Sequence, residues 1–483
     1  MSLDTADPKA ATRIHLRFAD DRQLIPHPLL APVLEHIEHS RRLKAGTPIL
    51  LDRHWRPLSP WLAYFRHLAA TAKPTTVRNY GYDALRFANF LDSRGTDVLH
   101  ATPDDVLAYR DHRLHGSPRP VSAATWQRET VTIRGIYSFL QDTGQRDNPP
   151  WLTIAATTPL TSRWTTEPDI RPLTRPQWRA FRNIGLGGNL PNGELDTTWR
   201  GSNPLRSQAG AQLALTTGMR VGEFSSLITA ELPRNSPDGA TVLLEACAKY
   251  NKRRRVHIPP KTLRLIDLYR ATERNQRVAA SRGSLWARRR ELYLVTEIDH
   301  YTRTVRGTLG GAASTWRFHQ LPPHLRRIAV INTDAGLEAL GLFLGRGGLP
   351  ISLRAWHATF KDASRRVSQL APEQMGGRRA NVTPHDLRHT FAVVLLKALT
   401  ARAIAHESGR RADILGPSSL SEHLVINPRL TVQRLLGHSN PTTTMVYLRY
   451  LEDTDTLIQD AFEQWDDQGM TFAELVLKER STQ

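Results

Sequence analysis

The sequence predicts a mainly α-helical protein of two domains, with a small antiparallel β component that makes the second domain α+β. Apolar residues recur at the spacing of one helix face through much of residues 59–145, and an apolar helix is predicted again within residues 206–232. The alternation typical of strands occurs in residues 241–259. Residues 146–172 are rich in proline, threonine and tryptophan without periodicity, so we interpret them as a linker between the domains.

The composition indicates the class of partner. The chain holds 65 lysines and arginines against 46 aspartates and glutamates, a formal net charge of +19. Neutralising phosphates releases counterions, so a surplus of this size indicates a polyanion such as nucleic acid. Charge alone does not separate specific from non-specific binding. With 483 residues and 40% hydrophobic residues, the chain is large enough for two or three cores.

Cysteine usage and hydrophobic runs indicate the compartment. Cys247 is the single cysteine, which excludes an intramolecular disulfide framework and a cysteine-based zinc site and fits a reducing cytosol. No apolar run approaches the ~18 residues of a membrane span, and the N-terminus has no signal-peptide core. We therefore expect a cytoplasmic protein with no membrane partner.

The first domain, residues 59–145, is expected to be a bundle of about four helices. Residues 77–91 place apolar side chains on one helix face. Thr102, followed by a proline and two aspartates, predicts a helix start. Residues 126–140 predict a further helix. The preceding residues 1–58 contain several prolines and form an extension with no assigned role.

Arginines occupy the polar faces of this bundle. For any one of them, an ordinary solvated surface is the simpler interpretation. As a set on a small bundle they suit contacts to a DNA backbone. The six are Arg78, Arg86, Arg110, Arg113, Arg128 and Arg134. Those retained as candidate DNA contacts are Arg78, Arg86, Arg128 and Arg134.

The second domain is expected to span residues 173–470, with residues 471–483 as a C-terminal tail. Its first reactive candidate is Arg220, because Gly218 lets the backbone turn and brings Arg220 to the start of a new helix. Glu223 lies three residues later on the same helix face, where its carboxylate would hold the guanidinium. Taken alone, this pair is more simply a surface ion pair worth about 0.3 kcal/mol.

A β-hairpin is predicted from residues 241–248 and 252–259, with Lys249 at its tip. A lysine on a mobile tip can reach a phosphate oxygen and donate a proton to it. The alternative is a basic hairpin that touches phosphates for charge alone. The further candidate phosphate contacts are Lys252, Arg253, Arg254 and Arg255.

Two predicted helices near the C-terminus carry the remaining candidates. The first starts at Thr383 and presents two histidines and an arginine in its early turns. The second covers residues 430–436, and a histidine and a tyrosine follow it nine residues apart. The candidates are His385, Arg388, His438 and Tyr447, and His389 lies one turn after His385.

The pair of His385 and His389 at i and i+4 also fits a zinc-binding helix. Three observations argue against this alternative. An aspartate stands where the usual glutamate base would be, Arg388 would lie beside a dication, and no third ligand is close in sequence. We therefore expect no metal site.

The same residues suit cleavage of a phosphodiester. A tyrosine hydroxyl attacks phosphorus without a metal. The guanidinium groups of Arg220 and Arg388 would neutralise the charge that develops on the phosphate oxygens. Lys249 would protonate the departing 5′ oxygen, and His385 and His438 would share proton handling and hydrogen bonds.

Four motifs in this order resemble those of the tyrosine recombinases, the phage integrase family. They are Thr-Gly-Met-Arg-Val-Gly-Glu at 217–223, Lys-Tyr-Asn-Lys-Arg-Arg at 249–254, His-Asp-Leu-Arg-His-Thr-Phe-Ala at 385–392 and Leu-Gly-His-Ser-Asn-Pro-Thr-Thr-Thr-Met-Val-Tyr at 436–447. The resemblance implies a helical, SAM-like core-binding domain and a catalytic domain that form a C-shaped clamp around double-stranded DNA. It also implies that Tyr447 forms a 3′-phosphotyrosyl bond without a cofactor.

The resemblance further implies a division of roles and an assembly. Glu223 would support the five groups that activate the phosphate, and four copies would exchange strands on two DNA sites, alone or with partner recombinases. The activating groups would be Arg220, Lys249, His385, Arg388 and His438. The expected activity is site-specific recombination in the integration, excision or transposition of a mobile element. The alternatives are a DNA-relaxing enzyme of the type IB topoisomerase kind and a DNA-binding protein that no longer cuts.

The chain departs from the compact members of this family in two places. Extra residues are expected within 260–380 and within 400–428. Lys252 is an alternative to Lys249 as the acid, and Tyr450 is the weaker alternative to Tyr447 as the nucleophile.

Overall fold

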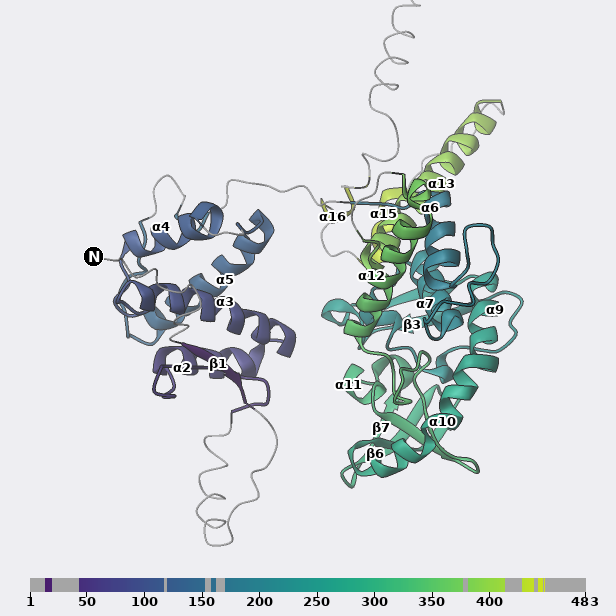
Figure 1. Ribbon diagram of the computed structural model, residues 1–483, viewed down its shortest axis with the longest axis horizontal. Helices are drawn as coiled ribbons and strands as arrows, with labels where there is room; N and C mark the ends of the chain where they lie inside the picture. The colour runs from purple at the N-terminus through teal and green to yellow at the C-terminus, as the bar shows by residue number, and fades with distance from the viewer. Residues whose placement is uncertain are drawn as a thin grey trace, which may run out of the picture. The chain divides into compact units, whose positions relative to one another are not determined.

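The computed structural model describes residues 14–19, 43–116, 120–152, 158–161, 170–376, 381–412, 428–437, 442–445 and 447. The chain divides into two compact units, Met1–Glu167 and Pro168–Gln483, and the division falls within the predicted linker (Figure 1). His438, Tyr450 and the C-terminal tail lie outside the described residues. No helix in the described ranges is long and apolar enough to cross a membrane.

The N-terminal unit is a helical bundle, as the periodicity of residues 59–145 predicts. The Thr102 side chain accepts a hydrogen bond from the Asp105 amide, and the Asp105 carboxylate accepts one from the Thr102 amide. This capping box satisfies amides that the first turn of a helix leaves free. Phe87, Tyr109 and Trp126 are among the buried aromatic side chains of the core. The helices are α2 (Ser59–Thr71), α3 (Pro74–Ser93), α4 (Pro103–Asp111), the π-helical turn η1 (His112–Gly116) and α5 (Ala123–Asp142).

The extension before the bundle contributes a hairpin that the sequence did not predict. Strands β1 (His15–Phe18) and β2 (Pro48–Leu51) pair antiparallel. Strand β2 packs on α3, where a Cβ at Gly81 would lie only 2.8 Å from the Pro48 ring. Glycine at this position therefore lets the hairpin approach the helix.

The C-terminal unit has a helical core around α7 (Pro204–Thr217). Helix α7 packs against α9 (Pro260–Tyr269) and α13 (Pro384–Ala412). The core also includes Trp356 and Phe360 of α12 (Leu353–Leu370). The other helical segments described here are α6 (Arg175–Ala180), η2 (Phe181–Leu186), α8 (Val221–Phe224), η3 (Thr229–Glu231), η5 (Arg270–Arg274), α10 (Asn275–Ala287), η6 (Arg289–Glu291), η7 (Phe318–Gln320), α11 (Pro323–Arg326), η8 (Pro372–Met375), α15 (Pro428–Leu436) and α16 (Thr442–Met445).

The predicted hairpin is present but its strands are shorter. Strands β3 (Ala240–Leu244) and β4 (Arg254–Ile258) pair antiparallel, with Val242 opposite Val256. The connection contains the turn η4 (Lys249–Asn251), in which Tyr250 has φ +62°. Residues 245–248 do not extend the strand, because the Ala246 amide donates to the carbonyl of His319 and the Ala248 amide donates to that of Glu245.

Residues within 260–380 form a second sheet in which strand order is β7-β6-β5-β8-β9. Strands β5 and β8 pair in parallel, and the other neighbours are antiparallel. Figure 1 shows this sheet at the end of the C-terminal unit opposite α13. The strands are β5 (Tyr293–Asp299), β6 (Thr304–Leu309), β7 (Ala312–Arg317), β8 (Ala329–Thr333) and β9 (Gly336–Ala339). The mainly helical fold with small sheets is thus confirmed, and the five-stranded sheet lies within the residues where the first insertion is expected.

Candidate active site

The first turn of α13 orients three candidate side chains. Asp386 accepts hydrogen bonds from the Thr383 amide (2.8 Å) and hydroxyl (2.9 Å), and this caps the helix. The cap fixes the turn so that Arg388 and His389 point into the unit and are buried, whereas His385 is exposed.

Arg388 joins three segments that are distant in sequence. Its Nη1 donates to the carbonyl of Gly218 at the end of α7, and its Nη2 donates to the carbonyl of Leu436 in α15 at 2.6 Å. Gly218 has φ +64°, and a Cβ there would lie 2.5 Å from the ring of Phe391. The turn predicted at Gly218 therefore also brings a carbonyl oxygen to Arg388.

The charge on Arg388 has no carboxylate partner within the described ranges. Burial, reinforced by the positive charge of Arg220, lowers the pKa of Arg388 to about 9. A buried cation held only by carbonyl dipoles is destabilised relative to water. An anion bound beside it would recover that energy, so the position is suited to a phosphate.

Arg220 is held by a buried carboxylate rather than by a surface ion pair. The Arg220 amide donates to Glu223 Oε2 at 2.8 Å, and Arg220 Nη1 donates to Glu223 Oε1 at 3.1 Å. Glu223 is 1% exposed, and Arg254 contributes two further bonds at 3.1 and 2.5 Å. Burial would raise the pKa of Glu223, but the bonds from Arg254 and Arg220 outweigh it and hold that pKa below its usual value. The interpretation of residues 220 and 223 as an exposed pair is therefore wrong.

The prediction that Arg254 of the hairpin is an exposed phosphate contact is corrected by the structure. Arg254 was expected among the exposed basic residues that contact phosphate, yet it is 8% exposed and both terminal nitrogens bind Glu223. In strand β4 its side chain points inward, because Arg254 alternates with the exposed Arg253 and Arg255. The alternation was visible in the sequence, but the buried partner 31 residues away was not.

The Tyr447 hydroxyl lies 2.9 Å from His389 Nδ1, and both residues are buried. Burial raises the pKa of Tyr447, whereas the charges of Arg388 and Arg220 lower it. The two guanidinium charges therefore oppose the effect of burial on this hydroxyl. The sequence prediction considered His389 only as a zinc ligand. The signal that would have found it is its position beside Arg388, one turn from His385 on the same face.

His385 stacks edge-on against His389, with ring centroids 4.2 Å apart. Desolvation of its ring by the neighbouring side chains, together with the charges of Arg388 and Arg220, lowers the pKa of His385, although Asp386 opposes the shift. The imidazole is therefore neutral at neutral pH. Within the described residues, no group of three histidine, cysteine or acidic side chains is arranged to hold a metal ion.

The hairpin tip is separate from these buried groups. Lys249 is exposed, and its ammonium lies 5.1 Å from the centre of the Tyr250 ring. Lys252, Arg253 and Arg255 are exposed as well. The three residues line, with Arg254 and α15, a groove of about 640 Å³. Arg254, which lines this groove, also binds the buried Glu223.

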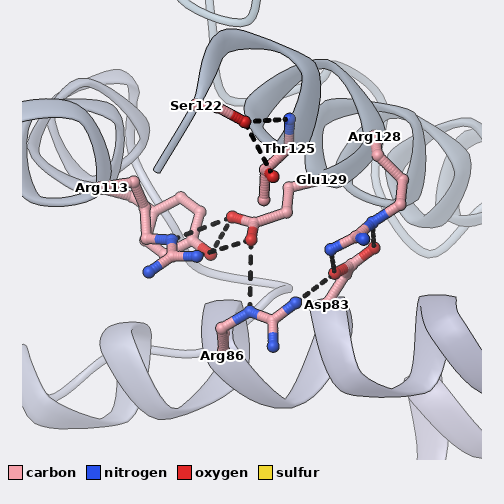
Figure 2. Close-up of polar contacts among 8 residues, drawn as sticks. Asp83, Arg86, Arg113, Ser122, Thr125, Arg128 and Glu129 are labelled. Atoms are coloured by element: carbon pink, nitrogen blue, oxygen red, sulfur yellow. Dashed lines mark hydrogen bonds and ion pairs between the residues drawn. The ribbon is translucent and has the colours of Figure 1, made fainter. Parts of the chain in front are cut away.

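The four arginines predicted on the N-terminal bundle differ in their surroundings. Arg134 is exposed, and Arg78 lies over the rings of Phe18 and Tyr82 at 5.0 and 5.9 Å. Arg86 and Arg128 instead pair with a buried carboxylate (Figure 2).

Comparisons with known proteins agree with the motif pattern. A family model described as "Phage integrase, N-terminal SAM-like domain" matches residues 62–144, and one described as "Phage integrase family" matches residues 194–409. Tyrosine recombinase XerD of Rhizobium meliloti is 24% identical over 383 residues, which cover 79% of this chain and 87% of that protein. XerD of Mycobacterium tuberculosis is 24% identical over 387 residues, covering 77% and 86%. The solved post-cleavage complex of XerH site-specific recombinase with palindromic difH substrate aligns over 86% of both chains, at 15% identity and a TM-score of 0.47.

Proposed function

Because the chain belongs to the phage integrase family of tyrosine recombinases, we propose that it cuts and rejoins double-stranded DNA through a covalent bond to Tyr447. The observation that carries this assignment is the position of the Tyr447 hydroxyl, which lies 2.9 Å from His389 and within the electrostatic influence of Arg388 and Arg220. A phenol can attack a phosphate, and guanidinium groups that bind the same phosphate would neutralise the charge that develops on it.

Each step of the reaction uses a different property of the site. Arg388 and Arg220 would bind the non-bridging phosphate oxygens, and Glu223 would keep Arg220 in place. Burial keeps the Tyr447 phenol protonated at neutral pH, so its proton must leave during attack. His389 can accept that proton, since its Nδ1 lies 2.9 Å from the hydroxyl.

The leaving 5′ oxygen needs a proton from elsewhere. Lys249, at the exposed hairpin tip, would move to the phosphate when DNA binds, and Lys252 is the alternative acid. His385 would accept or donate a hydrogen bond at the phosphate as a neutral imidazole. His438, outside the described residues, would complete the set. Exposed cations of the hairpin and of the bundle would contact the DNA backbone, among them Arg253, Arg255, Arg78 and Arg134.

The test is a DNA substrate nicked close to the cleavage site, which traps the covalent intermediate because the short fragment diffuses away. Wild-type protein should form a protein–DNA adduct through the 3′ phosphate, and Tyr447→Phe should form none. An adduct that persists in Tyr447→Phe but disappears in Tyr450→Phe would transfer the role of nucleophile to Tyr450. Adduct formation that survives a chelator would exclude the zinc alternative.

The biological reaction we propose is site-specific recombination that moves a mobile element, by a homotetramer on two DNA sites, in the cytoplasm. The large positive charge and the intact set of reactive groups support a DNA-cutting enzyme over a protein that only binds. Relaxation of supercoiled plasmid without exchange between two sites would favour the type IB topoisomerase alternative. If recombination products form only when two copies of the same DNA site are present, the topoisomerase alternative is excluded.

A further inference from the structure

Two buried carboxylates hold three arginines on the N-terminal bundle (Figure 2). Asp83 of α3 and Glu129 of α5 each have a side chain that is 1% exposed. Arg128 binds Asp83 through Nε (3.0 Å) and Nη2 (2.9 Å), and Arg113 binds Glu129 through Nε (2.9 Å) and Nη2 (2.6 Å). Arg86 spans the two acids, with Nη2 on Asp83 and Nε 3.2 Å from Glu129. Three elements, α3, η1 and α5, therefore meet in one cluster.

The three guanidinium groups share one feature. Each uses Nε and Nη2 for the carboxylates and leaves Nη1 without a hydrogen bond or ion pair to any described residue. The side chains are 37% exposed at Arg86, 13% at Arg113 and 44% at Arg128. Three positive charges and two negative charges leave a surplus of one. The cluster thus holds three partly exposed guanidinium groups in place and carries a net positive charge.

Stability alone does not explain this arrangement. Burying two carboxylates costs desolvation energy, and buried ion pairs are often replaced by apolar side chains without loss of stability. Tyr109, which packs with Phe87 and Trp126 in the aromatic core, also donates its buried hydroxyl to Glu129 at 3.2 Å. The cluster does, however, order three long side chains in advance, which reduces the entropy lost when they bind an anion.

We propose that Arg86, Arg113 and Arg128 form one phosphate-binding site for the DNA backbone, with Asp83 and Glu129 as its positioning residues. The proposal rests on the proposed function, from which it takes DNA as the ligand. Guanidinium groups fixed by carboxylates bind phosphate oxygens with their remaining N–H groups. Arg113 belongs to the set of six bundle arginines but not to the four retained as candidate DNA contacts, and it joins the site through Glu129.

The direction in which one substitution changes the affinity for DNA separates this proposal from a simple charge effect. Glu129→Gln makes the protein more positive, so general electrostatics predicts tighter DNA binding. If Glu129 positions the arginines, the same change releases Arg113 and Arg86 and weakens binding. Asp83→Asn should behave in the same way. Asp104→Asn is the matched control, because Asp104 is an exposed acid of α4 in the same unit and carries the same charge change.

The experiment measures the affinity of the full chain for a fluorescent DNA duplex at several salt concentrations. We expect Glu129→Gln to bind about tenfold more weakly than wild type, or worse, because charged hydrogen bonds to phosphate are lost. Asp104→Asn should bind equally or more tightly. Arg128→Lys keeps the charge but loses the two-bonded contact to Asp83, and it should also bind more weakly. Arg128→Ala should reduce the slope of log affinity against log salt concentration by about the amount that one phosphate contact contributes.

Two further readouts keep the outcomes distinct. Thermal unfolding checks that each variant is folded, and Arg128→Lys decides the question if Glu129→Gln does not fold. Folded variants that bind DNA as tightly as wild type would overturn the phosphate site. Failure of wild type to form the Tyr447 adduct on the nicked substrate, with the affinity differences intact, would instead count against the proposed function and leave the site standing.

Discussion

Replacing Glu223 by glutamine removes a negative charge from the centre of the candidate active site. Glu223 is 1% exposed and accepts bonds from Arg254 at 3.1 and 2.5 Å and from the Arg220 amide at 2.8 Å. Glutamine leaves the buried Arg254 guanidinium without a counter-ion. Removing one member of a buried pair costs about 3–5 kcal/mol, so we expect the free energy of unfolding to fall by that order. The rate of covalent adduct formation should fall as well, because Arg220 loses its charged support.

A double variant separates the lost ion pair from the lost chemistry. Glu223→Gln combined with Arg254→Met replaces the pair by uncharged side chains of similar length, a change that is often neutral for stability. We expect the double variant to recover most of the unfolding free energy. It should not recover the adduct rate, since Arg220 still lacks the carboxylate that holds its guanidinium.

Urea unfolding measures the stability, and single-turnover cleavage of the nicked substrate measures the rate. The pKa of Glu223 lies below its ordinary value of 4.5 in the folded protein, so the unfolded chain binds more protons near and below that pH. Its contribution is therefore present above pH 4.5 and is lost as the pH falls through the folded pKa. The free energy of unfolding of Glu223→Gln should lack this pH-dependent contribution. A variant with the wild-type urea midpoint and the wild-type adduct rate would refute the reasoning.

Three further predictions follow from the same geometry. His389→Ala removes the 2.9 Å partner of the Tyr447 hydroxyl and should slow adduct formation by about 100-fold, with His389→Gln less affected; an unchanged rate would remove this histidine from the mechanism. Desolvation and neighbouring guanidinium groups hold the pKa of His385 below 6.5. The single-turnover rate should therefore stay constant at neutral pH and fall only when the pH is lowered below that value. His385→Asn should abolish this fall in rate at acidic pH. Gly218→Ala, at a position with φ +64°, should lower the free energy of unfolding by more than about 1 kcal/mol. The control Gly283→Ala, in a helix with open space around the Cα, should raise it by up to about 1 kcal/mol. Equal effects of the two variants in urea unfolding would contradict the special role of Gly218.

Local patterns in the sequence predicted the elements that local forces stabilise. The capping box at Thr102, the helix start at Thr383 and the hairpin before residue 260 all depend on residues within a few positions of one another. The five-stranded sheet was not predicted, because its strands are four to seven residues long and one pairing joins β5 to β8 across two intervening strands. Such short, half-exposed segments have no distinctive period, and only their partners define them as strands.

The sequence by itself determined the family and predicted which residue types would serve the chemistry, because motifs keep reactive side chains at fixed local offsets. Only the tertiary structure decided that Arg254 holds Glu223 and that His389 meets Tyr447, pairs 31 and 58 residues apart. The physical reason is that burial and pairing at these sites depend on how separate helices and strands pack. Whether an arginine faces DNA or a buried carboxylate is settled by its neighbours in space.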